Sequence, residues 1–156
     1  MIERPDLPEL EIVLRLLMAF ASGALIGMNR EFRGKPAGFR TFGLVSIGSA
    51  VVVIVMEMEF GTGADAVSRV IQGVLTGIGF LGAGVIFRGD APDKVEGLTT
   101  AAAVWLTAGL GMAAGAGQYL IAGVGTLLGL SLLLFGGRFE RWFLKRWKNS
   151  KETDDE

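Results

Sequence analysis

Charged residues gather in short clusters along this chain, and long apolar stretches separate them. Each stretch is close to the roughly 20 residues with which a helix crosses about 30 Å of hydrocarbon. The pattern predicts five transmembrane helices, at residues 12–28, 42–56, 70–87, 98–116 and 119–135. The only charge within them is Arg15, one turn from an end, and we expect its long side chain to reach the membrane interface.

A single apolar stretch is more often a buried helix of a soluble protein. Five in 156 residues leave too little polar chain to cover such a core. The predicted fold class is therefore all-α, a polytopic membrane protein with a five-helix domain at residues 1–137. Residues 138–148, "RFERWFLKRWK", place aromatic side chains on one face among basic ones, which predicts a helix on the membrane surface. The polar residues 149–156 are predicted to be a disordered tail.

Basic residues predict the orientation. The first loop, "NREFRGKPAGFR", carries four basic residues against Glu31, and residues 138–148 carry five against Glu140. The positive-inside rule places both segments in the cytoplasm, and five crossings then place the N-terminus outside. The loop "RGDAPDKVEG" is an exception, because it has only Arg88 and Lys94 as basic groups. The N-terminal "MIERPDLPELE" lacks the positive start of a cleaved secretory signal.

The chain contains no cysteine and no histidine. Disulfides, thiolate chemistry and imidazole zinc ligands are thereby excluded. A metal site would have to use carboxylates, carbonyls and water, which suits a hard cation such as magnesium, but no D-x-D-x-D-G loop or similar cluster occurs. We therefore predict no catalytic residues, no enzyme activity, no cofactor, no dedicated metal site and no nucleic-acid partner.

The stretch "TGIGFLGAG" at residues 76–84 contains G-x-G-x-x-G, the spacing of a dinucleotide-binding loop. Such a loop needs a preceding strand and a βαβ unit, and this one lies inside an uninterrupted apolar run instead. On a helix, Gly73, Gly77 and Gly84 fall on one side, and Gly79 and Gly82 fall on a largely opposite side. Small residues let membrane helices approach closely, so we predict that the third helix is central to the bundle.

The fourth helix carries a heptad seam of small residues, which predicts a tight left-handed crossing. Shorter stripes occur in the first helix (Ala19, Gly23, Gly27) and the fifth (Ala122, Thr126, Gly129). The alternative is that the glycines permit a broken helix beside a substrate path. The predicted packing residues are Gly73, Gly77, Gly79, Gly82, Gly84, Gly97, Ala101, Ala108, Gly111 and Gly115.

Polar residues at four helix ends are predicted to converge near the cytoplasmic surface. Thr99 and Thr100 lie in the first turn of the fourth helix, where N–H groups and the dipole favour an anion, and arginines would complete such a site. The alternative is that the arginines bind lipid headgroups and the threonines cap a helix. The candidate cluster is Asn29, Arg30, Glu31, Arg40, Thr41, Arg88, Glu96, Thr99 and Thr100. On the outer side, Asp65 and Arg69 form a candidate pair one helical turn apart.

Three ordered motifs carry a family resemblance: "GALIGMNREFRGKPAGFRTFGLVSIG", "RVIQGVLTGIGFLGAGVI" and "GLTTAAAVWLTAGLGMAAGAG". They resemble the membrane domain of the MgtC/SapB family of bacterial inner-membrane proteins, over residues 23–117. The resemblance implies a five-helix inner-membrane domain with a cytoplasmic C-terminus. It also implies roles in growth at low magnesium, in virulence or acid resistance, and in some members in restraint of the membrane ATP synthase.

This chain departs from the family pattern at two positions. Phe42 stands where many relatives have histidine, and Ala103 stands where threonine or serine is frequent. Many relatives also carry a cytosolic regulatory domain, from which no role is carried over here.

Two functions from different classes fit these observations. The first is a regulatory membrane protein that contacts a membrane partner and acts in magnesium or ion homeostasis. The second is an oligomeric transporter or channel subunit for an ion. The expected partners are the lipid bilayer and a second copy of the chain, another membrane protein, or both.

Overall fold

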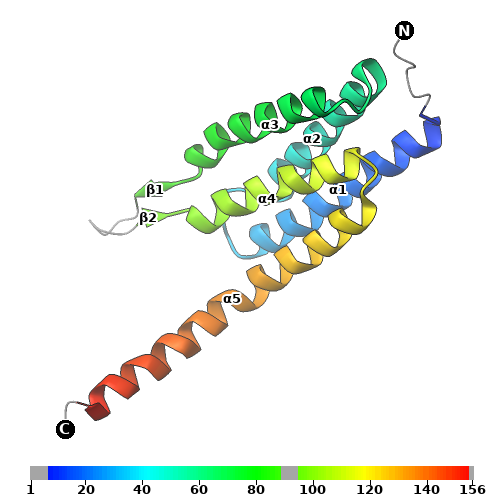
Figure 1. The fold of residues 1–156 in the computed structure, drawn as a ribbon. Helices are drawn as coiled ribbons and strands as arrows, with labels where there is room; N and C mark the ends of the chain where they lie inside the picture. The colour runs from blue at the N-terminus through cyan, green and yellow to red at the C-terminus, as the bar shows by residue number, and fades with distance from the viewer. Residues whose placement is uncertain (1–6, 89–94, 155–156) are drawn as a thin grey trace.

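The computed structural model describes the chain path of residues 7–88 and 95–154, and the side chains of residues 7–86 and 95–137. Its five long helices are each apolar enough to cross a membrane, which confirms the predicted five-helix membrane fold (Figure 1). The helices are α1 (Glu9–Phe32), α2 (Phe39–Phe60), α3 (Ala64–Gly84), α4 (Leu98–Gly115) and α5 (Tyr119–Asp154). Between α3 and α4 the strands β1 (Phe87–Arg88) and β2 (Val95–Glu96) form a short antiparallel pair.

Glycines in the left-handed region mark where the chain turns. Gly61, with φ +71°, ends α2, and its N–H donates to the carbonyl oxygen of Glu57. Gly97, with φ +93°, precedes α4, and a Cβ at this position would overlap the carbonyl oxygen of Val85. Only glycine adopts such a conformation at little steric cost, so these turns are fixed by the sequence.

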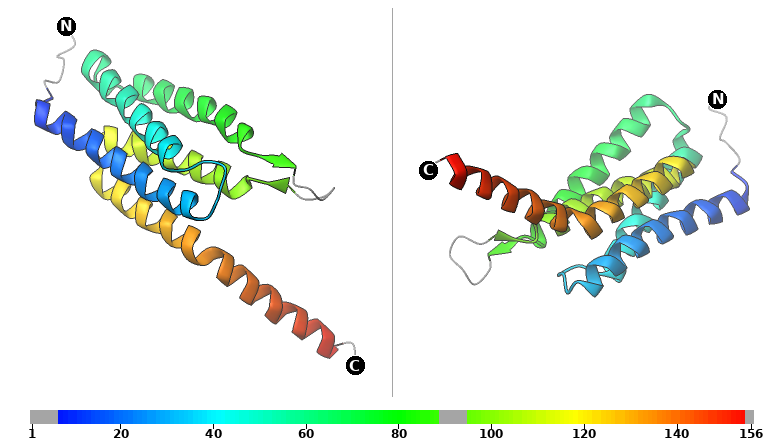
Figure 2. Two further views of the ribbon diagram at one scale, coloured as in Figure 1. Left: turned by 180° about the vertical axis from the view of Figure 1, so that it is seen from behind. Right: turned by 90° about the horizontal axis from the view of Figure 1, so that it is seen from below.

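The connections lie at two opposite ends of the bundle (Figures 1 and 2). One end, here the Arg15 end, holds the start of α1 and the short links 61–63 and 116–118. The other, here the Arg30 end, holds the link 33–38, the β1–β2 pair and the departure of α5 from the bundle. The two ends therefore correspond to the two membrane surfaces.

Helix α4 is the centre of the bundle and contacts all four other helices. Its small residues meet backbone of α2: a Cβ on Gly115 would lie 2.7 Å from the carbonyl oxygen of Ala50, and one on Gly111 would overlap that of Ser46. A second seam joins α1 to α2, where a Cβ on Gly23 would lie 2.5 Å from the carbonyl oxygen of Phe42. Close backbone approach of this kind is how small residues hold membrane helices together.

The prediction that the third helix is central is wrong. Helix α3 packs along α4 and touches α2, and in α3 only Ile78 and Gly82 are buried. A Cβ on Gly82 would lie 3.8 Å from that of Ala101, an ordinary contact. The remaining glycines predicted to pack, Gly73, Gly77, Gly79 and Gly84, have no neighbouring atom within 4 Å of such a Cβ. Glycine spacing shows which faces permit close approach, but it does not supply a neighbour for them.

Helix α5 continues past the membrane segment. Ala122, Thr126 and Gly129 are buried against the bundle, whereas the helix beyond Gly137 projects away from it (Figure 1). The expected surface helix 138–148 and most of the expected disordered tail 149–156 are one uninterrupted extension through Asp154. No glycine or proline occurs between residues 138 and 154 to end the helix. Residues 155–156 and the side chains after 137 lie outside the described part.

Candidate functional site

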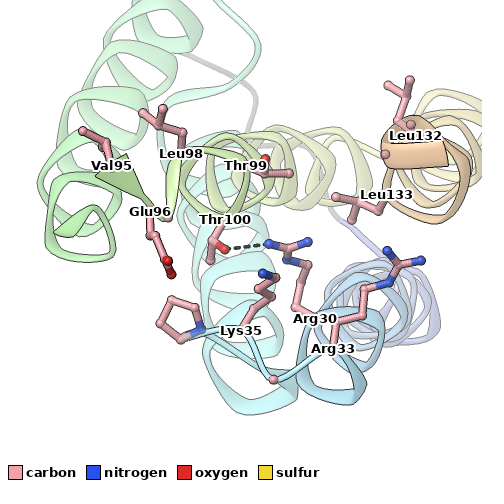
Figure 3. Close-up of a pocket in the computed structure, with 15 residues that line it drawn as sticks. Arg30, Arg33, Lys35, Val95, Glu96, Leu98, Thr99, Thr100, Leu132 and Leu133 are labelled. Atoms are coloured by element: carbon pink, nitrogen blue, oxygen red, sulfur yellow. Dashed lines mark hydrogen bonds between the residues drawn. The ribbon is translucent and has the colours of Figure 1, made fainter. Parts of the chain in front are cut away.

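A pocket of about 750 Å³ opens at the Arg30 end, where α1, β2, α4 and α5 meet the link 33–38 (Figure 3). The last turn of α1 supplies Arg30, the link 33–38 supplies Arg33 and Lys35, and the first turn of α4 supplies Thr99 and Thr100. Strand β2 and α5 complete the wall, and their lining residues are Val95, Glu96, Leu132, Leu133, Gly136 and Gly137.

Arg30 is the most buried charged group of this pocket. It is 4% exposed, and its Nη2 donates a hydrogen bond of 2.7 Å to Oγ1 of Thr100. Its Nε is buried with no hydrogen-bond partner, and among the described residues no carboxylate lies within ion-pair distance of it. A buried cation without a counter-charge is costly, so the site favours the arrival of a negative group.

Further positive potential surrounds Arg30. Arg33 donates to the carbonyl oxygen of Leu134 over 3.2 Å, and Lys35 extends from the link toward the space in front of Thr100 (Figure 3). Gly97 precedes α4 without a side-chain cap, so no side chain occupies the free N–H groups of that first turn. These N–H groups and the helix dipole attract anions.

The structure brings together only part of the predicted cytoplasmic cluster. Arg30, Glu96, Thr99 and Thr100 line the pocket. Glu31 instead accepts a 2.8 Å hydrogen bond from the backbone N–H of Phe39 at the start of α2. Three other predicted members do not line it: Asn29 has a buried, unpartnered Oδ1, and Arg40 and Thr41 are exposed on α2. The side chain of Arg88 lies outside the described part.

Two pocket residues, Arg33 and Lys35, are absent from the predicted cluster. They belong to the basic first loop whose charge predicted the orientation. The turn at residues 33–38 folds this loop back beside α4, and its Gly-Lys-Pro sequence was the available signal.

A polar cluster at the Arg15 end was not predicted. Arg15 is 7% exposed; its Nη1 donates to Glu57 over 2.5 Å and to the carbonyl oxygen of Gly115 over 2.9 Å. Its Nε donates to Glu11 over 2.9 Å, and the hydroxyl of Tyr119 donates to the same carboxylate. Arg15 is therefore held among carboxylates at this end of the bundle rather than exposed, and the expectation that it reaches the membrane interface stays a prediction. The four-residue spacing of Glu11 and Arg15 was its one sequence signal.

The predicted outer pair, Asp65 and Arg69, forms no ion pair in the described structure. Both residues are exposed and line a hollow of about 640 Å³ between α2 and α3. Its other walls are apolar, formed by Val51, Val52, Val55, Met56, Phe60, Ala66 and Val70. The hollow marks the side on which α3 stands away from α2.

Comparison with known protein families matches residues 16–142 to the MgtC family. The chain belongs to the MgtC family. It is 42% identical to SrpB of Synechococcus elongatus over 151 residues, covering 89% of this chain and 83% of SrpB. It is 40% identical to YhiD of Escherichia coli K12 over 130 residues and 42% identical to MgtC of Salmonella typhimurium LT2 over 116 residues.

These matches confirm the family resemblance in the sequence. The matches to YhiD and MgtC cover 79% and 74% of this chain, respectively, but only 59% of YhiD and 48% of MgtC. The chain therefore spans only about half to three-fifths of the length of these two relatives. No solved structure matches the chain. Membership of the MgtC family and the five spanning helices together establish a membrane protein.

Proposed function

We propose that this MgtC-family protein acts in magnesium homeostasis by regulatory contact with another protein of the bacterial inner membrane. The link to magnesium is supported by relatives: YhiD has the words magnesium transporter in its name. The proposed orientation keeps the Arg30 end in the cytoplasm and the Arg15 end outside, because the first loop is basic. The observation that carries the proposal is the set of open glycines on one side of α3, Gly73, Gly77 and Gly84.

The open glycines lie on a helix that otherwise suits a protein contact better than lipid. Gln72 is exposed about 12 Å from the start of α3, on the side that also carries Gly79, and its Nε2 donates to the Ser68 hydroxyl over 3.3 Å. A polar amide facing hydrocarbon is unfavourable, whereas across a helix pair it finds a partner. A transmembrane helix with its own small residues and a polar group is therefore the proposed occupant. The membrane ATP synthase, which the family resemblance suggests, is one candidate source of such a helix.

Photocrosslinking from Phe80 tests this contact. Phe80 is 83% exposed and lies three residues after Gly77 and four before Gly84, on the same side of α3. Replacing it with the photoreactive analogue p-benzoylphenylalanine should give a defined adduct with another membrane protein in cells. Phe135, exposed on α5, is the matched control and should not give that adduct.

A second change sharpens the experiment. Gly77→Leu should prevent the Phe80 adduct and the effect of the protein on growth at low magnesium, while the protein remains folded. Adducts of equal yield from Phe80 and Phe135, or none from Phe80, would contradict the proposal. An adduct of twice the chain mass would instead indicate a homo-oligomer.

The second candidate function, an oligomeric ion transporter or channel subunit, would need a path for the ion, and the pocket at the Arg30 end is a poor one for magnesium. Its described lining carries Arg30, Arg33 and Lys35 against Glu96, which repels a magnesium ion rather than attracting it. No group of three or more acidic residues that could hold a metal occurs in the described part of the chain. Protein-dependent magnesium flux into liposomes, measured with an entrapped magnesium-sensitive dye, would support this function and overturn the regulatory one.

A further inference from the structure

We infer that the pocket at the Arg30 end binds a phosphate group, held by Arg30, Thr100 and the first-turn N–H groups of α4. The phosphate belongs to the headgroup of an anionic lipid or to a free phosphate compound, and both present the same oxygens to the protein. This inference concerns the end of the bundle and uses no residue of α3, so it stands apart from the proposed partner contact.

The charge of Arg30 is unbalanced. Arg30 is 4% exposed, and among the described residues its guanidinium makes one hydrogen bond, to the neutral Thr100 hydroxyl, while its buried Nε has no partner there. The contrast within the chain is Arg15, which is equally buried but meets two carboxylates. A phosphate oxygen beside Arg30 would supply both the missing acceptor and the missing negative charge.

Several hydrogen-bond donors converge on the space beside Arg30. Thr100 follows Gly97, the residue at the start of α4, by three positions, so its hydroxyl and the N–H groups of the first turn share one helix end. In Figure 3 Arg30 and Thr100 point toward each other, and Lys35 extends toward the same space from the link. A planar arginine fork beside a helix N-terminus is a suitable arrangement for phosphate oxygens.

The remaining wall of the pocket is apolar in part. Leu98, Leu132 and Leu133 line the pocket together with the polar donors. At about 750 Å³ the pocket exceeds the needs of a single inorganic phosphate, since small-molecule sites fall within roughly 300–1,000 Å³. The leucines give an apolar neighbour to whatever carries the phosphate, such as the glycerol and upper chain of a lipid.

Thermal unfolding of the purified protein in a zwitterionic detergent tests the inference. The two probes are inorganic phosphate, compared with sodium chloride at equal ionic strength, and short-chain phosphatidylglycerol, compared with short-chain phosphatidylcholine. We expect at least one of the phosphate-bearing anions to raise the midpoint beyond its control, because a ligand that binds only the folded state stabilises it. A shift with inorganic phosphate identifies a free-phosphate site, and a shift with the lipid alone identifies a headgroup site.

Single substitutions test whether the anion raises the unfolding midpoint by binding in this pocket. Arg33→Gln should weaken binding of the responding anion about tenfold, and Thr100→Val should weaken it as well. Arg40→Gln is the matched control, because Arg40 is exposed on α2 and does not line the pocket. Arg30→Gln should abolish the anion response yet leave the ligand-free protein as stable as the wild type or more stable, since it removes an unbalanced buried charge.

Two results would overturn the inference. One is a wild-type midpoint that neither inorganic phosphate nor phosphatidylglycerol raises above its control. The other is a response that Arg40→Gln reduces as much as Arg33→Gln, because general surface charge would then explain it. Should Arg30→Gln fail to fold, the comparison of Arg33→Gln with Arg40→Gln still decides.

Discussion

Helices α3 and α4 are both rich in glycine, yet they use it in different ways. In α4, Gly111 and Gly115 lie against the backbone of α2 at Ser46 and Ala50. In α3, four of the five glycines face open space. Glycine permits close approach in both helices, but only α4 is surrounded by neighbours within the chain. The closed core of α1, α2 and α4 accounts for the fold, and α3 offers a contact surface that the chain does not use itself.

Buried charge shows the same difference between a completed and an incomplete site. Arg15 is compensated by Glu11 of α1 and Glu57 of α2 and donates to the carbonyl oxygen of Gly115 in α4, while Tyr119 of α5 donates to Glu11. Arg30 has a hydroxyl partner and a free Nε beside a pocket. The Arg15 cluster therefore serves stability, whereas the Arg30 site has capacity left for a ligand.

The largest effect is expected from breaking the closed core at Arg15. Arg15→Leu leaves the carboxylate of Glu57, whose side chain is 15% exposed, without its cation, which should lower the free energy of unfolding by about 3 kcal/mol. Thermal or denaturant unfolding in detergent measures the loss. Glu9→Gln, an exposed change near the same end of α1, should have little effect.

A double variant tests whether the loss comes from uncompensated charge. Removing Glu57 as well, in Arg15→Leu/Glu57→Leu, should recover a large part of the lost stability, because the double variant no longer buries a carboxylate without its cation. Additive losses in the double variant would show that packing, rather than the ion pair, accounts for the effect.

The fold was predictable from sequence where the signal is local. Apolar length predicted the five membrane helices, and small-residue spacing indicated the seams at Gly23 and Gly111. The position of α3 was not predictable in this way. Its glycines repeat as regularly as those of α4, but which helix surrounds which depends on the packing of the whole bundle.

The candidate site was predicted in part for the same reason. Thr100 and Arg30 could be placed at one end because both occupy helix ends. The pairing of Arg15 with Glu57 joins residues 42 positions apart, and no local pattern links them. The role of Lys35 depends on the turn that folds the first loop back beside α4.

A smaller effect is expected from adding one methyl group to the α2–α4 seam. In Gly111→Ala the new Cβ would overlap the carbonyl oxygen of Ser46, so the two helices must separate. Such overpacking should lower the free energy of unfolding by about 1–3 kcal/mol. Gly109→Ala is the matched control in the same helix, since a Cβ there meets no atom within 4 Å. Equal stability of the Gly111 and Gly109 variants would contradict the close contact between α2 and α4 at Gly111.

The smallest effect is expected from the same substitution on α3, and it has the opposite sign. In Gly77→Ala the new methyl group meets no neighbouring atom of the described residues within 4 Å, so no clash offsets the gain in helix propensity. Alanine is favoured over glycine inside a helix by roughly 0.5–1 kcal/mol, so the purified single chain should become slightly more stable. A loss of stability as large as that of Gly111→Ala would show that α3 is already packed against protein in the purified state. Because a second copy is the only other protein present there, that loss would place the open glycines in a homo-oligomeric contact.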